Sequence, residues 1–130
     1  MNQFGEMAIR AVELFNSRKV NTPKDAWEEA ANKVIASRSV RMKGCPKNAF
    51  LALCSEGKIR GIPAGNYTRS RKNREYALEA LKILSNYPEF NNRLGLWKGV
   101  LQTLGESEEK KHNGQMDVVI ALWSTGYVAG

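Results

Sequence analysis

Apolar residues recur every three to four positions along most of this chain, the spacing that places them on one face of an α-helix. The clearest start signal is Thr22 followed by Pro23, because threonine is a good N-cap and proline suits the first helical position. Glycines that follow an apolar stripe mark several helix ends. The pattern predicts helices from Phe4 to Phe15, Thr22 to about Ser37, Pro46 to Gly57, Ser70 to Asn86, Pro88 to Gly105 and Met116 to Gly126.

Two stretches lack this periodicity. Residues 38–44 are short and basic, and we expect them to be irregular. Residues 58–68 contain several glycines and a proline, and they predict an ordered loop, with a short strand or wing, pinned to the core by Ile59, Ile62 and Tyr67. The predicted fold class is therefore all-α: a compact bundle of about five or six helices with one ordered Gly/Pro loop.

Aromatic residues at helical spacing indicate where the core lies. Trp27, Trp97 and Trp123 each have aliphatic neighbours one helical turn away, so we expect all three to anchor the core. Phe90 and Leu94 fall on the same side of the fifth predicted helix as Trp97, and we expect them to face inward.

Length and composition are those of a globular protein. A chain of 130 residues can bury roughly two-thirds of the surface that it exposes when unfolded, and 42% apolar with 25% charged residues argues against disorder. We see no repeat or linker, and expect a single domain over residues 1–130. No apolar run approaches the ~20 residues that span a bilayer, and no signal peptide is evident. We expect a cytoplasmic protein with no membrane partner, in which Cys45 and Cys54 lie on opposite faces of one helix as reduced thiols.

The net charge of +7 comes from one part of the sequence. Residues 1–37 contain five basic and five acidic residues, and residues 75–130 contain five basic and seven acidic residues. Residues 38–74 contain ten basic residues and one acidic residue, Glu56, which gives this segment a charge of +9. Such asymmetry predicts a surface for an anionic partner, such as a nucleic acid, a phosphate group or an acidic protein.

Within the basic segment the Gly/Pro loop runs into the start of a helix, where free N–H groups and the helix dipole favour an anion. Ser70 is expected to cap this helix or to contact a phosphate. Tyr67 supplies an aromatic ring among the charges, as is common on nucleic-acid surfaces. The candidate nucleic-acid or anion-binding residues are Lys58, Arg60, Tyr67, Arg69, Ser70, Arg71, Lys72, Asn73 and Arg74.

The function that this pattern favours is a noncatalytic binding module for an anionic partner, with nucleic acid first. Phosphate contacts from lysine and arginine would dominate the affinity, and any sequence specificity would need side chains such as Arg71 or Asn73 to reach base edges. A helix-turn-helix would need a long turn or a small wing, because about eleven residues separate the third and fourth predicted helices. Two alternatives stay open: an adaptor or inhibitor module for an acidic protein, and a small phosphate-ligand-binding protein or enzyme that uses the same loop.

Signals for catalysis are weak. His112 is the only histidine, the spacing of the two cysteines matches no zinc pattern, and the loop glycines form neither a P-loop nor a dinucleotide fingerprint. We therefore assign no catalytic residue, metal ligand or cofactor, and favour a protein that is not an enzyme. Asn113, Gln115 and Asp117 form a polar group before the last helix, and we hypothesise that they cap it or face the basic loop and help to fix it.

Two groups of short motifs stand out. The first comprises CPxxAFL from Cys45, Gly57, GIP from Gly61, YTRS from Tyr67 and Asn73, and the second comprises NxQMDVV from Asn113 and LW at Leu122 and Trp123. Together they cover about a third of the chain and resemble a family of small, uncharacterised bacterial proteins. The resemblance implies a bacterial, cytoplasmic origin. It implies no activity and no functional residues, because that family has no assigned function.

Overall fold

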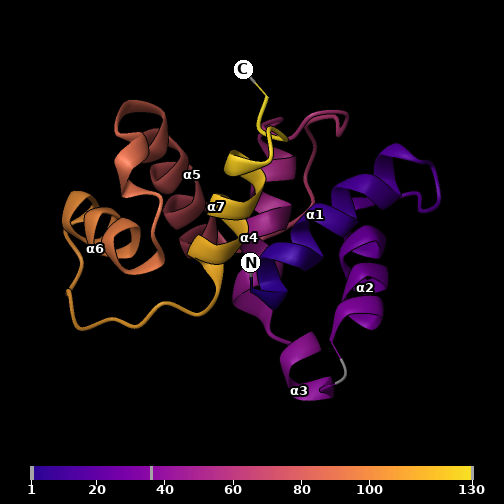
Figure 1. The fold of residues 1–130 in the computed structure, drawn as a ribbon, viewed down its shortest axis with the longest axis horizontal. Helices are drawn as coiled ribbons and strands as arrows, with labels where there is room; N and C mark the ends of the chain where they lie inside the picture. Colours follow the sequence, from indigo (N-terminus) through magenta and orange to yellow (C-terminus); the bar gives the residue numbers. More distant parts are fainter. Residues whose placement is uncertain (1, 36, 130) are drawn as a thin grey trace.

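Seven α-helices and a short 3-10 helix build the part of the chain that a computed structural model describes, residues 2–35 and 37–129 (Figure 1). The elements are α1 (Gln3–Asn16), α2 (Pro23–Val34), α3 (Arg38–Arg41), α4 (Gly44–Ser55), α5 (Arg71–Asn86), η1 (Pro88–Phe90), α6 (Arg93–Leu104) and α7 (Gln115–Ser124). Within these residues there is no strand, and extended backbone pairs only at an isolated antiparallel bridge between Ile59 and Val128. The predicted all-α class is confirmed.

The helices surround α4 and α7, which occupy the middle of the bundle (Figure 1). Helix α1 packs on α2 and α7, while α5 packs on α4, α6 and α7. Helix α4 is apolar on nearly all sides, and every residue from 49 to 55 is buried. A helix that is apolar all round needs neighbours on every side. Its central position therefore follows from its sequence, and the elements around it are positioned against it.

Aromatic pairs link α4 and α5 to the outer helices. Trp27 of α2 and Phe50 of α4 are buried with ring centroids 5.4 Å apart. Tyr76 of α5 meets Trp97 of α6 edge to face at 5.0 Å. The prediction of tryptophan core anchors is confirmed for Trp27 and Trp97, whereas Trp123 of α7 is only half-buried.

The prediction that the fifth helix begins at Pro88 is wrong. Pro88 opens only the 3-10 helix η1, and α6 begins after an interruption. Asn92 causes the new start, because its side-chain oxygen accepts a hydrogen bond from the N–H of Gly95 (2.7 Å), which is an N-cap contact. Phe90 therefore lies outside the helical phase of α6 and is 39% exposed, and Leu94, in the first turn of α6, is 68% exposed.

Two other boundaries differ from the prediction. The segment 38–44, expected to be irregular, holds the short helix α3, and α4 begins at Gly44 rather than at Pro46. Proline is tolerated in this first turn because the first N–H groups of a helix have no partner within it. Helix α2 ends at Val34, and its predicted span includes Ala36, which lies outside the described residues.

The loop between α4 and α5 is anchored as predicted. Ile59 and Ile62 are buried, and Tyr67 packs partly buried against the core. Backbone hydrogen bonds on both sides of Ile59 join the loop to residues 127–129, with N–O distances of 2.9 and 2.7 Å. The predicted short strand is thus a single bridge, which ties the loop to the C-terminal segment.

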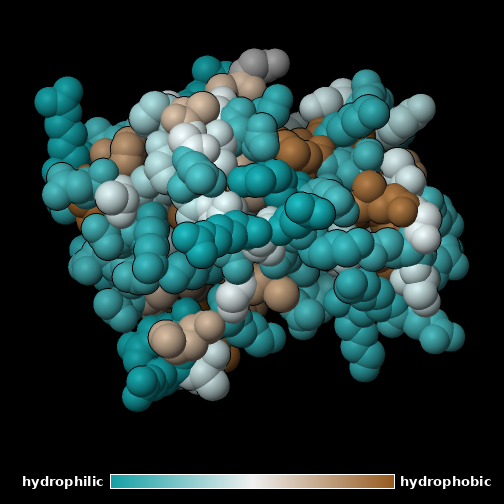
Figure 2. Space-filling view, turned by 180° about the vertical axis from the view of Figure 1, so that it is seen from behind, coloured by the Kyte–Doolittle hydropathy of each residue, from teal (hydrophilic) through white to brown (hydrophobic). Residues whose placement is uncertain are grey.

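The surface is polar with a few apolar exceptions. Seen from behind, it is mainly hydrophilic, with small hydrophobic areas between charged side chains (Figure 2). The large apolar side chains that are exposed are Met42, Tyr87, Phe90 and Leu94. In the described part of the chain no helix has the length and apolar character needed to cross a membrane.

Candidate anion-binding surface

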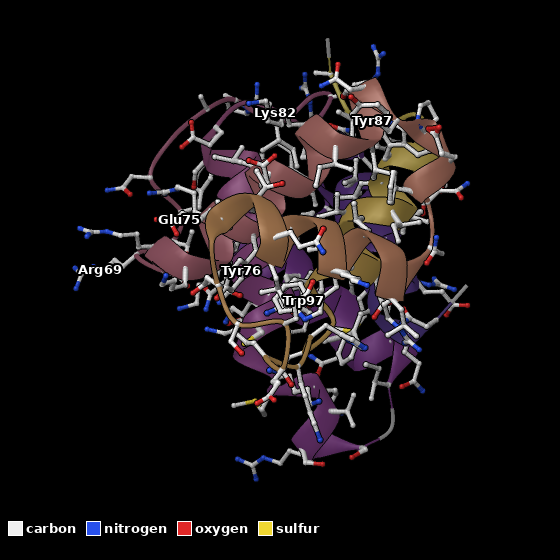
Figure 3. All side chains as sticks on the ribbon, turned by 90° about the vertical axis from the view of Figure 1, so that its left-hand side faces the viewer. Arg69, Glu75, Tyr76, Lys82, Tyr87 and Trp97 are labelled. Carbon is white, nitrogen blue, oxygen red and sulfur yellow. The ribbon has the colours of Figure 1, made fainter. Side chains whose placement is uncertain are left out.

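The candidate residues of the loop and of the first turn of α5 do not form one surface. Nε of Arg60 donates a hydrogen bond to the backbone oxygen of Gly126 (2.8 Å), and Lys58 lines a hollow together with Lys82 of α5. Figure 3 shows Lys82 at the top and Arg69 far to the left, reaching into solvent. The two ends of the loop therefore carry their cations to different parts of the molecule.

Lys72 and Arg74 are compensated by carboxylates. Nζ of Lys72 lies 3.0 Å from Oε1 of Glu106 and 3.8 Å from Oε2 of Glu75, and the hydrogen bond with Glu106 raises the pKa of Lys72. Nε of Arg74 lies 3.5 Å from Oε1 of Glu56, the acidic residue within the basic segment. These ion pairs leave less positive charge at the start of α5 than the sequence alone indicates.

Arg69 lines a hollow of about 450 Å³ between the start of α2, α4 and the end of the loop, which we call the α4 hollow. Its lining residues are Lys24, Lys47, Asn48, Leu51, Asn66, Tyr67, Thr68 and Arg69. Three of them are cations, and they come from three different elements. Of these three cations only Lys47 has a carboxylate of the described residues within ion-pair distance, that of Glu28 at 3.1 Å. The hollow thus combines uncompensated positive charge with amide and hydroxyl groups.

The end of the loop is fixed to α4 through Ser55. The backbone oxygen of this buried residue accepts a hydrogen bond from the N–H of Gly65 (3.0 Å), and its hydroxyl accepts one from the N–H of Tyr67 (3.0 Å). The same hydroxyl donates to the backbone oxygen of Leu51 (2.8 Å). One turn of α4 therefore determines where the side chains of residues 66–69 lie.

A chain of side-chain hydrogen bonds continues from α4 to α7. Thr68 Oγ1 donates to Oδ1 of Asn48 (2.9 Å) and accepts from the N–H of Ser70 (3.1 Å). Nδ2 of Asn73 donates to Oγ of Ser70 (3.0 Å), and Oδ1 of Asn73 accepts from Nε2 of Gln115 (3.2 Å). Ser70 occupies the N-cap position of α5, but its hydroxyl makes no capping bond to the backbone. We call this chain the polar network.

Three polar residues at the start of α7, Asn113, Gln115 and Asp117, have different partners. Gln115 is 2% exposed and reaches the start of α5 through Asn73, which is itself 9% exposed. Asn113 joins only through its backbone N–H, which donates to Oε1 of Gln115. Asp117 instead lies 3.7 Å from Arg93 of α6. Of the three residues only Gln115 makes a side-chain contact toward the basic segment, and that contact is with the first turn of α5 rather than with the loop. Neither Asn113 nor Asp117 caps α7, whose N-cap residue is Gly114 without a side-chain capping bond. Because Asn73 is buried, it does not belong to an exposed binding surface.

Lys24 and Lys47 are not among the binding residues predicted from the sequence. Lys24 lies 45 positions before Arg69, and it reaches the same hollow only because α2 packs beside α4. Lys47 lies within the CPxxAFL motif, which was noted as a resemblance and not as part of the binding surface. Two local signals included this position, the motif and the +9 segment of residues 38–74.

A second cluster of titratable side chains surrounds Glu106, directly after α6. The Tyr76 hydroxyl and the Lys72 ammonium lower the pKa of the Glu106 carboxyl. Nζ of Lys110 lies 3.9 Å from Oε1 of Glu106 and 5.3 Å from the centroid of the Tyr76 ring. Burial raises the pKa of Tyr76. Because the carboxylate is already paired with two ammonium groups, we interpret the cluster as a contact that holds the connection before α7 against α5.

Cysteine and histidine do not form a site in the described residues. No three side chains of the metal-ligating types His, Cys, Asp and Glu converge there. Cys45 is partly exposed and Cys54 is buried, both are free thiols, and burial raises the pKa of Cys54. His112 is partly buried, and its Nδ1 has no hydrogen-bond partner among the residues described.

The chain belongs to a family of unknown function, DUF6979, whose family model matches residues 1–129. No curated protein matches the chain, and no solved structure matches it. The expected membership of an uncharacterised family is confirmed, and the bacterial origin stays a prediction. The family supplies no activity, so the function has to be inferred from the geometry of the chain itself.

Proposed function

We propose that this DUF6979 protein is a noncatalytic binding module that holds the phosphate groups of a nucleic acid at the α4 hollow. One observation carries the proposal: Lys24, Lys47 and Arg69 come from three separate elements to line the same hollow. Cations that lie close together repel one another, and an anion between them removes that repulsion. Only the Lys47 charge is offset by a carboxylate among the described residues.

Polar groups around the cations suit phosphate oxygens. Asn48 and Asn66 line the hollow and carry amide N–H donors, and Oδ1 of Asn48 is directed to Thr68. An amide whose oxygen already accepts a hydrogen bond presents its nitrogen as the free donor. Phosphate contacts of this kind, from lysine, arginine and amide groups, fix a nucleic acid on a protein without reading its sequence.

The exposure of the hollow favours a polymer over a small phosphate ligand. Lys24, Asn66 and Arg69 are all exposed, so an anion bound between them stays in contact with solvent. Sites for small ligands usually enclose 70–90% or more of the ligand surface. A nucleic acid backbone that passes across the hollow meets no such requirement, and Arg71, also exposed, lies two residues further along the chain.

The proposal is tested by fluorescence anisotropy of labelled single-stranded and double-stranded RNA and DNA over a salt series. Each phosphate contact contributes a slope of about −0.9 to log K against log salt, or about −0.7 on single strands. The K24E/R69E variant is expected to lower the steepness of this slope by about two and to weaken binding strongly. K98E/K111E changes the net charge by the same amount at exposed lysines elsewhere and serves as the control.

Two results would overturn the proposal. One is an absence of binding to all four probes at low salt, which would leave an acidic protein as the anionic partner. The other is an equal loss of binding in K24E/R69E and K98E/K111E, which would mean that net charge attracts nucleic acid and the α4 hollow does not. Circular dichroism of both variants checks that the helices remain.

A further inference from the structure

A second hollow, of about 520 Å³, lies between α5, α7 and the C-terminal segment, and we call it the α5–α7 hollow. Apolar side chains line much of it: Leu78 and Leu81 from α5, Trp123 from α7 and Val128. Lys58 and Lys82 add two exposed ammonium groups, and neither has a carboxylate within ion-pair distance among the described residues. Lys82 lies well away from Arg69 in Figure 3, so this hollow is separate from the α4 hollow.

We propose that the α5–α7 hollow binds a small aromatic anion, whose ring lies against Trp123 and whose acidic group lies near Lys58 and Lys82. The volume falls in the range of about 300–1,000 Å³ that is typical of small-ligand sites. Such sites are apolar with a few polar groups that orient the ligand, which is the composition found here.

The aromatic part of the proposal rests on Trp123. Of the three tryptophans it is the one that the core leaves half-buried, and it lines the hollow together with Leu78 and Leu81 of α5. Aromatic rings that pack against each other gain about 0.5–1.5 kcal/mol beyond the burial of their area. A flat ring therefore covers this indole better than an alkyl chain of equal area.

The anionic part rests on the two lysines. A neutral ligand would lower the water content around both ammonium groups without supplying a counter-charge, which costs free energy. An acidic group removes that cost and forms charge-assisted hydrogen bonds.

The wall on the C-terminal side belongs to the fold. Val128 pairs with Ile59 in the isolated bridge, and the N–H of Ala129 donates to the backbone oxygen of Lys58 (2.7 Å). These bonds hold the backbone of Lys58 and one side of the hollow in fixed positions relative to each other. The site is thus preorganised, and a ligand does not have to order a loose segment to bind.

The test is a titration of the protein with 1-naphthyl phosphate, followed by NMR of the three indole N–H resonances. Each tryptophan reports on a different place. Trp27 reports on the core and Trp123 on the α5–α7 hollow. Trp97 lines a third hollow together with Lys98 and Lys111, which we call the hollow beside α6. The W123F variant assigns its resonance by the loss of that peak. We expect a saturable shift of the Trp123 resonance, with Trp27 and Trp97 unmoved.

Variants and a neutral probe separate the two parts of the proposal. K58A/K82A is expected to weaken binding of 1-naphthyl phosphate about tenfold, as removal of two exposed charge contacts would. K98A/K111A, at the hollow beside α6, is expected to change it less than twofold. 1-Naphthol, which lacks the phosphate, is expected to bind about tenfold more weakly than 1-naphthyl phosphate.

The inference is overturned if the Trp97 resonance shifts as much as that of Trp123, or if K58A/K82A binds as tightly as the unchanged protein. Equal binding of 1-naphthol would also overturn it. R69E is expected to bind 1-naphthyl phosphate normally, because Arg69 lines only the other hollow. A failure of nucleic-acid binding at the α4 hollow therefore leaves this inference intact. A failure of 1-naphthyl phosphate binding at the α5–α7 hollow likewise leaves the proposed function intact.

Discussion

Removal of the Asn73 side chain tests whether the polar network stabilises the fold. Asn73 accepts a hydrogen bond from Nε2 of Gln115 and donates one to Oγ of Ser70. In Asn73→Ala the Nε2 donor of Gln115, a residue that is 2% exposed, loses its partner and stays buried, while Oε1 keeps its bond from the N–H of Asn113. A buried donor left without a partner costs about 1–3 kcal/mol, and the bond to Ser70 contributes about 1 kcal/mol more.

Helix propensity offsets part of this loss. Alanine is the better helix former by up to ~0.7 kcal/mol, and Asn73 lies in the first turn of α5. We therefore expect Asn73→Ala to lower the free energy of unfolding by about 2–3 kcal/mol in urea denaturation, with an unchanged m-value. Asn32→Ala is the matched control, because it makes the same replacement at an exposed position of α2, where helix propensity alone is expected to leave stability unchanged or to raise it by up to ~0.7 kcal/mol.

A double variant separates the hydrogen bond from the burial of its partners. In Asn73→Leu with Gln115→Met both amides are replaced by apolar groups of similar shape, so neither amide stays buried without its partner. The N–H of Asn113 loses its acceptor in Gln115→Met and in the double variant alike, so this loss cancels in the comparison. We expect the double variant to lose less stability than the sum of the two single variants, by at least about 1 kcal/mol. If Asn73→Ala matches Asn32→Ala, or if the two single effects simply add, the network does not stabilise the protein as argued.

Two further predictions concern titratable groups. Because burial raises the pKa of Cys54, we expect Ellman's reagent at pH 8 to label Cys45 alone in the native protein and both thiols in guanidinium chloride; equal rates for the two in native buffer would contradict this. The Tyr76 hydroxyl and the Lys72 ammonium lower the pKa of Glu106 in the folded state, so its contribution to stability is present above the unfolded pKa and is lost as the pH falls through the folded pKa. Urea midpoints should therefore decline less between roughly pH 5 and pH 3 in Glu106→Gln than in the unchanged protein, and identical slopes would refute the assignment.

Most of the helices could be predicted because they bury apolar residues at helical spacing, and α4 because a compact apolar run lies between Pro46 and Gly57. The exceptions have local causes that periodicity does not register. Helix α3 has only four residues, too few to show a repeat, and the side chain of Asn92 starts α6 where the apolar pattern continued. The anchors of the loop were also predictable from apolar positions. Ile59 and Ile62 are large apolar residues in a mainly polar stretch, and burial in the core removes their side chains from water.

The basic surface could be predicted only in part, because charge counted along a sequence ignores partners that the fold supplies. Glu106 lies 34 residues after Lys72 and neutralises it, and Arg74 finds Glu56 across the loop. Lys24 belongs to a segment without net charge, yet it contributes to the α4 hollow. Within the +9 segment, Lys72 and Arg74 are compensated by carboxylates, and Lys58 and Arg60 lie beside the C-terminal segment. Lys47 and Arg69 line the α4 hollow together with Lys24 from another segment.

The position of the α4 hollow depends on the core more than on the loop. Lys47 and Asn48 belong to α4, and Ser55 of the same helix fixes the loop end that carries Arg69. The part of the hollow formed by α4 and the part formed by the loop end are therefore both positioned by the same buried helix. Only Lys24 comes from a different helix, and the contact between α2 and α4 that sets its distance includes the buried aromatic pair at 5.4 Å. The separation of the cations is therefore set by packing in the interior, which explains how residues far apart in the sequence come to line one hollow.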